Sequence, residues 1–387
     1  MSSTKHSTGP IAVTTRALGP DLARGLMLLF IALANAHGFV HPDGGTVIRA
    51  MPVATALVDR VVAFAETVLV DGRSYPMFAA LFGYGMVQIA RRQESNGSSW
   101  QDAHALLRRR GRWLIVLGLV HATLLYYGDV LAAYGLLALA LVSALRHSDR
   151  RLLITAGVWA VVGALVYGLF ASPMNPEMVV EVYPWSVEEN PVRGALLRLS
   201  AIVVSAPLFA ITAAACLLVG FWAAKRRLLE EPEQHRVVLR RIVAIGLPVS
   251  VLGGVPLALY TSGALSGSAQ QVIPVAALHA LTGLAGGPAY AALIALWALR
   301  VNKDNVVITA LQATGQRSLT CYLIQSVVWA VLFFPFLLDL GHTMPLWQSV
   351  PVAVATWAAT VGLAEWMRRA GVRGPVEVLL RRLTYQR

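Results

Sequence analysis

The chain has 387 residues, of which 57% are hydrophobic and only 13% are charged. A soluble domain carries about 25% charged residues, so the composition excludes a soluble enzyme and indicates an integral membrane protein. The net charge of +12 does not indicate nucleic-acid binding, because the basic residues lie between apolar runs. We expect one membrane domain (19–370) between a cytoplasmic tail (1–18) and a basic cytoplasmic C-terminal segment (371–387).

Apolar runs long enough to cross a bilayer recur along the whole chain. About 20 residues cross a hydrocarbon core of ~30 Å, and ten runs come near that length. The first run has no small-residue cleavage site after it, so we expect it to be a retained span. The sequence predicts an all-α helix bundle with spans at about 21–40, 74–90, 112–128, 130–146, 152–171, 199–224, 242–261, 272–299, 318–339 and 347–367.

The apolar stretch 51–70 differs from these runs because it carries a polar stripe of Asp59, Arg60, Glu66 and Thr67. We interpret it as an amphipathic helix that lies at the surface or dips into a cavity. With this helix non-spanning and the N-terminus inside, few of the 32 Lys and Arg residues fall outside. The outer ones are Arg49, Arg60, Arg73, Arg193 and Arg198. The positive-inside rule therefore favours ten spans with both termini in the cytoplasm.

Ionisable side chains inside a span cost roughly 2.5–3.5 kcal/mol at the helix centre, so each is a candidate functional group. In the first run, Asp21, Arg24 and Asn35 fall on one side of a helix and could face a polar cavity. The alternative for the first two is that Asp21 caps the helix and Arg24 reaches lipid phosphates. His37 lies on roughly the opposite side, near the outer end.

His121 is the strongest single signal, because it is expected near the middle of a span that runs from Trp113 to Tyr127. A neutral imidazole suits a general base or a transient acyl carrier; the alternative is a hydrogen bond between helices. Asp129 follows in a turn, where it could cap the next helix or orient a substrate hydroxyl. On a straight helix, eight residues span about 12 Å, so no direct contact with His121 is expected.

Other polar residues in the apolar runs give weaker signals. His279 and Gln325 suit interhelical hydrogen bonds, His342 lies in an outer turn, and Glu365 suits an ion pair with the arginines that follow it. The two cysteines, Cys216 and Cys321, lie in apolar runs and indicate neither a disulfide nor a Cys-based metal site. Walker, Rossmann, His-Glu-x-x-His and Gly-x-Ser-x-Gly patterns are absent from the sequence, so no metal or permanently bound cofactor is expected.

Five motifs spread over residues 21–385 together resemble the YeiB-like family of bacterial membrane proteins, also called domain of unknown function 418. Small departures are Val378 and Leu380, where the family often has tryptophan, and Cys321, where it often has asparagine. The motifs are Asp21-Leu-Ala-Arg24-Gly25 with Asn35; Met77-Phe78-Ala-Ala-Leu81-Phe82-Gly83-Tyr-Gly85; Gly118-Leu-Val-His121 through Tyr127-Gly128-Asp129-Val-Leu131 to Tyr134; Gly315-Gln-Arg317-Ser-Leu319-Thr320-Cys-Tyr322 with Gln325-Ser326; and Gly374-Pro375-Val-Glu377 with Arg381 and Thr384-Tyr385.

This family is grouped with transmembrane acyltransferases, which include the lysosomal heparan glucosaminide acetyltransferase and the acyltransferase-three enzymes. The resemblance implies an enzyme of the bacterial plasma membrane that takes an acyl group, most simply acetyl, from cytoplasmic acyl-CoA. The acceptor would be a hydroxyl or amine at the outer face. The catalytic histidine of the heparan enzyme follows its first span, where this chain has His37 and His41 without a matching motif. We therefore expect His121 to carry the catalytic role.

In this hypothesis His121 deprotonates the acceptor or relays the acyl group, Asn35 donates to the thioester oxygen, and Asp129 orients the acceptor. Acyl-CoA would be a co-substrate, and its phosphates would be held by a group of five arginines: Arg24, Arg108, Arg109, Arg110 and Arg112. The alternative is that these arginines set the membrane topology and bind lipid headgroups. A substrate pathway is expected along Asp21, His37, Asp59, Glu66 and Arg73.

Two other classes of function stay open on the same residues. A small-molecule transporter or permease of the inner membrane would use the polar residues of the spans as a substrate pathway. A scaffold in a cell-envelope complex would use them neither for catalysis nor for transport. The expected partners are the lipid bilayer and a small-molecule, envelope-glycan or lipid acceptor; a homodimer stays open. Composition and topology do not separate these classes, and only the resemblance favours the enzyme.

Overall fold

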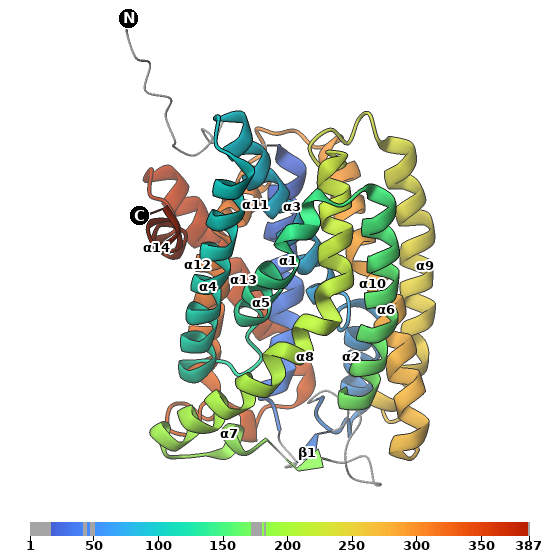
Figure 1. The fold of residues 1–387 in the computed structure, drawn as a ribbon. Coiled ribbons are helices and arrows are strands. Elements are labelled where there is room, and N and C mark those ends of the chain that lie inside the picture. The colour runs from blue at the N-terminus through green and yellow to red at the C-terminus, as the bar shows by residue number, and fades with distance from the viewer. Residues whose placement is uncertain (1–16, 42–44, 47–50, 172–179, 182, 386–387) are drawn as a thin grey trace, which may run out of the picture.

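The computed structural model describes residues 17–41, 45–46, 51–171, 180–181 and 183–385. It is a bundle of long helices around α1 (Leu18–Ala36), which contacts α3, α10, α11, α12 and α13 (Figure 1). The other long helices are α3 (Ser74–Ser95), α4 (Trp100–Leu124), α6 (Asp149–Ala171), α8 (Pro191–Lys225), α9 (Arg236–Thr261), α10 (Ala269–Ala298) and α13 (Leu346–Arg369).

Shorter elements complete the bundle and its two ends. The α-helices among them are α2 (Leu57–Leu69), α5 (Leu131–Leu141), α7 (Pro184–Val187), α11 (Val306–Gln316), α12 (Ser318–Phe333) and α14 (Pro375–Tyr385). The 3-10 turns are η2 (His37–Phe39), η4 (Val142–Arg146) and η5 (Leu340–His342). β1 (Gly45–Thr46) and β2 (Val180–Glu181) form one short antiparallel pair, with Gly45 opposite Glu181. The all-α prediction is confirmed.

Among the residues that the structure describes, six helices are long and apolar enough to cross a membrane. They correspond to α1 with η2, α6, α8, α9, α10 and α13; α5 with η4, and α12, are apolar but shorter. The expectation of ten spans is therefore not confirmed. α4 is 25 residues long, but its first half is polar and basic, which lowers its mean hydropathy.

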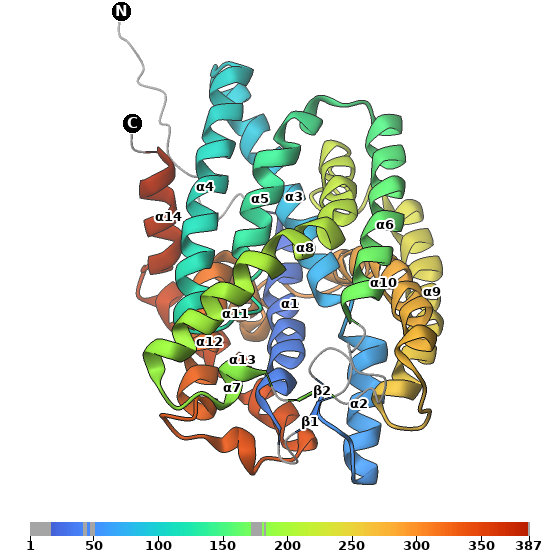
Figure 2. The same cartoon turned by 60° about the horizontal axis from the view of Figure 1, so that its bottom comes forward.

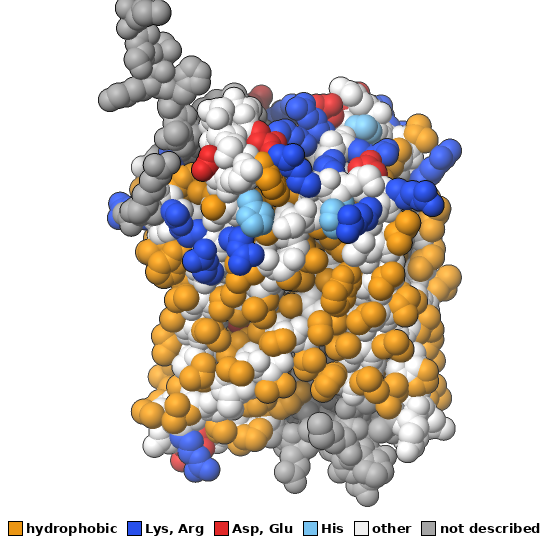
Figure 3. Space-filling view, viewed as in Figure 1, with side chains coloured by type: hydrophobic (Ala, Val, Ile, Leu, Met, Phe, Trp, Pro, Cys, Tyr) orange, Lys and Arg blue, Asp and Glu red, His pale blue; other side chains and the backbone are white. Residues whose placement is uncertain are grey.

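The surface of the bundle agrees with a multi-pass membrane protein. Hydrophobic side chains form a broad belt around it, while Lys and Arg side chains gather above the belt at one end (Figure 3). Leucines and valines on α6 and α9 point outward, among them Leu165, Leu169, Ile245 and Leu252, which are 58–70% exposed. Outward apolar side chains in this number are expected where lipid, and not water, covers the protein.

Small residues allow the closest helix contacts, as at the glycines of α10. A Cβ atom added to Gly283 would collide with the carbonyl of Gly72, and one added to Gly287 with the backbone of Met77. α10 thus packs directly against the turn between α2 and α3. α8 has 35 residues, about 52 Å at 1.5 Å per residue, and it crosses the bundle obliquely (Figure 2).

α2 is the amphipathic helix predicted at 51–70, and three of the four residues of its predicted polar stripe face inward; the fourth, Arg60, is exposed. Asp59, Glu66 and Thr67 are at most 5% exposed, whereas Leu57 is 79% and Val61 59% exposed. The helix has 13 residues, about 20 Å, and is too short to cross a ~30 Å core. Its polar stripe contacts α9 and α13, so its apolar side faces away from the bundle.

Candidate functional site

The structure brings His121 and Asp129 into direct contact. His121 Nδ1 lies 2.7 Å from Asp129 Oδ2, and both side chains are almost completely buried. The expected separation of about 12 Å was wrong, because α4 ends at Leu124 and the chain turns back before α5 begins at Leu131. For the same reason His121 lies in the last turn of α4 and not near the middle of a span.

Asp129 has two roles in this contact. Its Oδ1 accepts the backbone N–H of Ala132 at 2.8 Å in the first turn of α5, which confirms the predicted cap. Its Oδ2 accepts from His121, because an ionised carboxylate is only an acceptor. The proton of a neutral His121 therefore sits on Nδ1, and Nε2 presents its lone pair.

His121 Nε2 is buried and has no hydrogen-bond partner among the described residues. The ring lies beside Tyr322 of α12, with 5.1 Å between the ring centroids. The Tyr322 hydroxyl approaches the backbone of Val130 without completing a hydrogen bond. A basic nitrogen and a phenol therefore face the same interior space between α4, α5 and α12.

Further unpaired polar atoms continue along the same face of α12. Gln325 lies three residues after Tyr322, and Trp329 lies four residues after Gln325, which places all three on one side of the helix. Gln325 donates from Nε2 to the Leu28 carbonyl of α1 at 3.4 Å, which confirms the predicted interhelical hydrogen bond. Gln325 Oε1 and Trp329 Nε1 have no partner among the described residues. We call His121, Asp129, Tyr322, Gln325 and Trp329 the His121 site.

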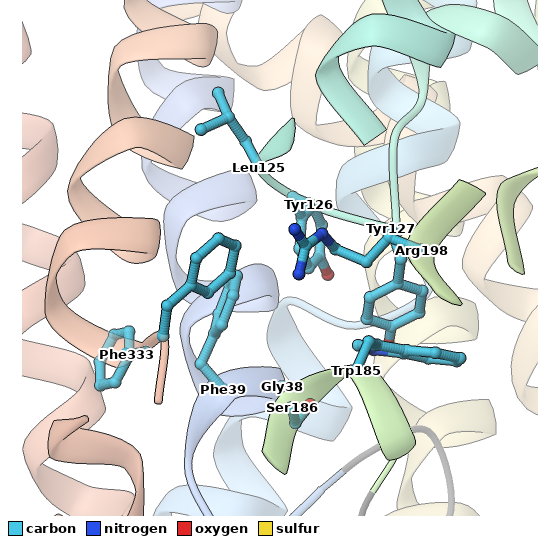
Figure 4. A pocket seen from close by; sticks show the side chains of 10 residues that line it. Gly38, Phe39, Leu125, Tyr126, Tyr127, Trp185, Ser186, Arg198 and Phe333 are labelled. Carbon is cyan, nitrogen blue, oxygen red and sulfur yellow. The ribbon is translucent and has the colours of Figure 1, made fainter. Parts of the chain in front are cut away.

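A pocket opens next to the last turn of α4 (Figure 4). About 310 Å³ of space in and in front of it is not filled by protein atoms, including the open space at its mouth. Its walls are mostly aromatic, and Arg198 of α8 is the cation among them. The lining residues are Gly38, Phe39, Leu125, Tyr126, Tyr127, Trp185, Ser186, Arg198, Phe333 and Phe334. We call this the outer pocket; the sequence did not point to Arg198 as a site residue.

The first-span candidates do not gather at His121. Asn35 is half-buried near the end of α1, and its side chain makes no hydrogen bond with another described residue. Asp21 lies at the other end of α1, where it contacts Arg24 at 3.3 Å and accepts from Gln316 Nε2 at 3.1 Å. About 21 Å of helix separates Asp21 from Asn35.

Two of the expected pathway residues form a pair. His37 Nδ1 lies 3.2 Å from Glu66 Oε2, so η2 is linked to α2 through buried side chains. Asp59 instead accepts the backbone N–H of Trp347 at 2.9 Å, at the start of α13. The predicted pathway from Asp21 through His37, Asp59 and Glu66 to Arg73 is thus divided among separate contacts.

Arg73 is the centre of a second buried polar cluster, at the turn from α2 to α3. Its Nε donates to Ser250 Oγ at 2.9 Å, and Nη1 donates to the Asp71 carbonyl at 2.7 Å and the Thr67 carbonyl at 3.1 Å. Nη1 also contacts the His279 ring at 3.0 Å, and Nη2 donates to the Ser250 carbonyl. We call Arg73, Thr67, Asp71, Ser250 and His279 the Arg73 cluster.

The basic segment expected to hold acyl-CoA is spread around α4. Arg108 and Arg112 are exposed, and Arg109 Nη1 donates to the Thr384 carbonyl of α14 at 3.3 Å. Arg110 is half-buried and interacts electrostatically with Tyr385, Arg24 and Glu377. Arg24 and Arg110 are thus close enough for their like charges to repel each other.

The C-terminal motif has a structural role that the sequence did not reveal. Glu377 of α14 accepts the backbone N–H groups of Leu319 and Thr320 at 2.8 and 3.1 Å, and the Thr320 hydroxyl at 2.5 Å. It thus caps the first turn of α12 from 57 residues away in the chain. Arg317 donates to the Val372 carbonyl at 2.7 Å; burial lowers the pKa of its guanidinium, and Glu377 opposes that shift.

The remaining candidates are held by local contacts. His342 Nδ1 lies 2.8 Å from Asp339 Oδ1, and Glu365 pairs with Arg368 and Arg369 at 2.7 Å, as predicted. The His41 ring lies 4.6 Å from that of His342, and burial lowers the pKa of His41. Within the described part of the chain, no group of three or more His, Cys, Asp or Glu could hold a metal ion.

Comparison with known proteins agrees with the resemblance at the coarse level. The chain is 24% identical over 409 aligned residues to "Uncharacterized protein YxaH" of Bacillus subtilis (strain 168), and the alignment covers 94% of this chain and 93% of that protein. The family "Protein of unknown function (DUF418)" matches residues 223–387, which include the Arg317 and Glu377 motifs. The chain is therefore a helical protein of membrane type whose C-terminal part, residues 223–387, matches DUF418.

Proposed function

We propose that the chain is a plasma-membrane acyltransferase of the YeiB-like family, within the transmembrane acyltransferase superfamily, with both termini in the cytoplasm. It moves an acyl group, most simply acetyl, from cytoplasmic acyl-CoA to a hydroxyl or amine at the outer face. The observation that carries this proposal is the His121–Asp129 contact of 2.7 Å with Nε2 buried and unpaired. A histidine oriented by a carboxylate through Nδ1 is the arrangement of a general base.

The proposed transfer starts with the acceptor group at His121 Nε2. Nε2 takes the proton of the acceptor O–H or N–H while the acceptor atom attacks the thioester carbonyl. The new C–O or C–N bond forms, the C–S bond breaks, and the CoA thiolate leaves with the proton from Nε2. Asp129 stabilises the imidazolium between these two steps.

The acyl donor would enter from the Lys and Arg end of the bundle. Arg24 and Arg110 are the two arginines of the basic group that interact with each other inside the bundle, so they are the ones proposed to bind the CoA phosphates. Eleven residues of α4 separate Arg110 from His121, about 16 Å. The pantetheine arm would cover that distance along α12, where the unpaired groups of Gln325 and Tyr322 could accept and donate.

A thermal-shift experiment on the purified chain in detergent tests the proposal. We expect acetyl-CoA to raise the melting temperature of wild type and of His121→Asn, since His121 does not bind the phosphates. ADP controls for the nucleotide part, and free CoA for the acyl group. If no member of the CoA series shifts the melting temperature, acyltransferase activity is excluded and the small-molecule transporter remains. A transporter of an unrelated solute is not expected to bind CoA.

A further inference from the structure

The outer pocket contains a buried arginine that has no carboxylate partner among the described residues. Arg198 is 3% exposed. Its Nε donates to the Thr123 carbonyl at 3.1 Å, and its guanidinium carbon lies 4.5 Å from the Phe334 ring centroid. The acid nearest to it on α7–α8, Glu188, pairs with Arg193 at 3.2 Å. The two Nη groups of Arg198 line the pocket without a hydrogen bond to any described residue.

A second donor in the pocket is also unpaired. Trp185 Nε1 is buried and has no hydrogen-bond partner among the described residues, and its side chain lines the pocket opposite Phe39 (Figure 4). Tyr127 lies against Trp185, with 4.5 Å between ring centroids. Buried donors are normally satisfied, and a buried cation is normally paired. A ligand that fits here therefore brings acceptor atoms and negative charge.

A simpler role for Arg198 is to stabilise the C-terminal end of α4. Cations there interact favourably with the helix dipole and the last carbonyls. One N–H group, Nε, already does this through Thr123. The Nη groups point instead into the pocket, where aromatic rings exclude water and strengthen a charge-assisted hydrogen bond (Figure 4).

The pocket is also close to His121. Leu125 and Tyr126, which line it, donate their backbone N–H groups to the His121 carbonyl at 2.8 and 3.2 Å. Arg198 donates to the carbonyl of Thr123, two residues after His121, so the pocket lies against the turn of α4 that carries the imidazole.

From these contacts we infer that the outer pocket binds an anionic group, a phosphate or a carboxylate, through Arg198 and Trp185. Resting on the proposed function, the ligand is the acyl acceptor, and the enzyme acts on anionic acceptors whose apolar or ring-shaped body lies against Tyr127 and Phe334. The anionic group can belong to a lipid headgroup or to a soluble sugar. The two sources share one chemistry, and the experiment separates them.

The test measures binding to the full chain in an uncharged detergent, by thermal shift and titration. The soluble probes are glucose 1-phosphate and glucuronate, with glucose as the neutral control. The lipid probe is phosphatidylglycerol, with diacylglycerol as its control. We expect at least one anionic probe to bind and its neutral control to fail. Binding by the soluble probes alone identifies a soluble ligand, and binding by phosphatidylglycerol alone identifies a lipid. Binding by none, or equal binding of the neutral controls, overturns the inference.

Matched variants assign the binding to Arg198. Arg198→Gln should weaken the anionic probe about ten- to hundredfold, because it removes a charge-assisted hydrogen bond. Arg193→Gln is the control on the same helix, since Arg193 is exposed and paired with Glu188. Trp185→Phe removes one N–H group and leaves Arg198 in place, so it should weaken the probe several-fold even if Arg198→Gln does not fold. Unchanged affinity in both pocket variants overturns the assignment.

The results of this binding test can be distinguished from the results that test the proposed function. His121→Asn keeps the pocket and should bind the anionic probe like wild type. Anion binding without any response to acetyl-CoA would leave the pocket an anion site and remove the acyltransferase. A response to acetyl-CoA without anion binding would keep the acyltransferase and remove the anionic acceptor.

Discussion

The Arg73 cluster and the His121 site are both buried polar groups between membrane-type helices, but they differ in how completely they are hydrogen-bonded. Nε, Nη1 and Nη2 of Arg73 all donate to described partners. In the His121 site, His121 Nε2, Gln325 Oε1 and Trp329 Nε1 have none. Paired buried groups hold a fold together, whereas unpaired ones cost free energy and are retained where a ligand or reaction needs them. The comparison therefore assigns structure to the first and function to the second.

The largest expected effect is the loss of Arg73. Arg73→Met removes the donor to the carbonyls of Thr67, Asp71 and Ser250, and breaking a buried charged network of this kind costs about 3–5 kcal/mol. We expect little folded protein by size-exclusion chromatography in detergent. Arg60→Met, at an exposed position, is the control. A normal melting temperature for Arg73→Met would show that the cluster is not structural.

His121→Asn should remove activity without removing the fold. Asparagine keeps an N–H donor near the position of Nδ1 for Asp129 and deletes Nε2. Loss of a general base slows transfer about 10²- to 10⁴-fold. The rate is measured as release of the CoA thiol from acetyl-CoA in proteoliposomes supplied with an acceptor, and the melting temperature serves as the fold control. A variant that transfers at the wild-type rate would exclude His121 as the base.

A smaller effect is expected when the Arg73 cluster loses one acceptor. Ser250→Ala removes the oxygen that Arg73 Nε donates to, and an unpaired buried donor costs about 1–3 kcal/mol. The melting temperature in detergent should fall. If this variant were as stable as wild type, the Arg73 cluster would not differ from the His121 site in its contribution to stability.

The smallest effect is expected at the His121 site. Tyr322→Phe removes only a buried hydroxyl that has no hydrogen-bond partner among the described residues, so the melting temperature should stay within the error of measurement or rise slightly. The pair Ser250→Ala and Tyr322→Phe thus tests the comparison directly, because each variant removes one hydroxyl from a buried cluster. A large destabilisation by Tyr322→Phe would mean that the protein already satisfies this group.

Much of the fold could be predicted from the sequence, because apolar periodicity determines helices and their exposed sides. The all-α bundle and the non-spanning 51–70 helix followed from that pattern. The end of α4 did not. The span was expected to run to residue 128, whereas the helix ends at Leu124. Leu125, Tyr126 and Tyr127 are compatible with a helix, so no signal in the sequence indicated the earlier turn.

The site was harder to predict for the same reason. His121 and Asp129 were both candidates, but their contact depends on where α4 ends. Other pairs join residues far apart in the chain, such as Arg73 with Ser250 and Glu377 with Thr320. A single sequence carries no signal for such partners. In the sequence, Arg198 looked like one more cation on the outer side. Its contacts with Thr123 of α4 and with Phe334, just after α12, are visible only in the folded structure.

The cap that Glu377 places on α12 has a consequence for how the protein is made. A membrane chain is synthesised and inserted from its N-terminus, so α12 enters the bilayer before Glu377 exists. The first turn of α12 stays open until α14 folds back onto it. Residues made well after α12 therefore complete this interior helix, and the helix that carries Tyr322 reaches its final form only once α14 has been synthesised and has folded back onto it.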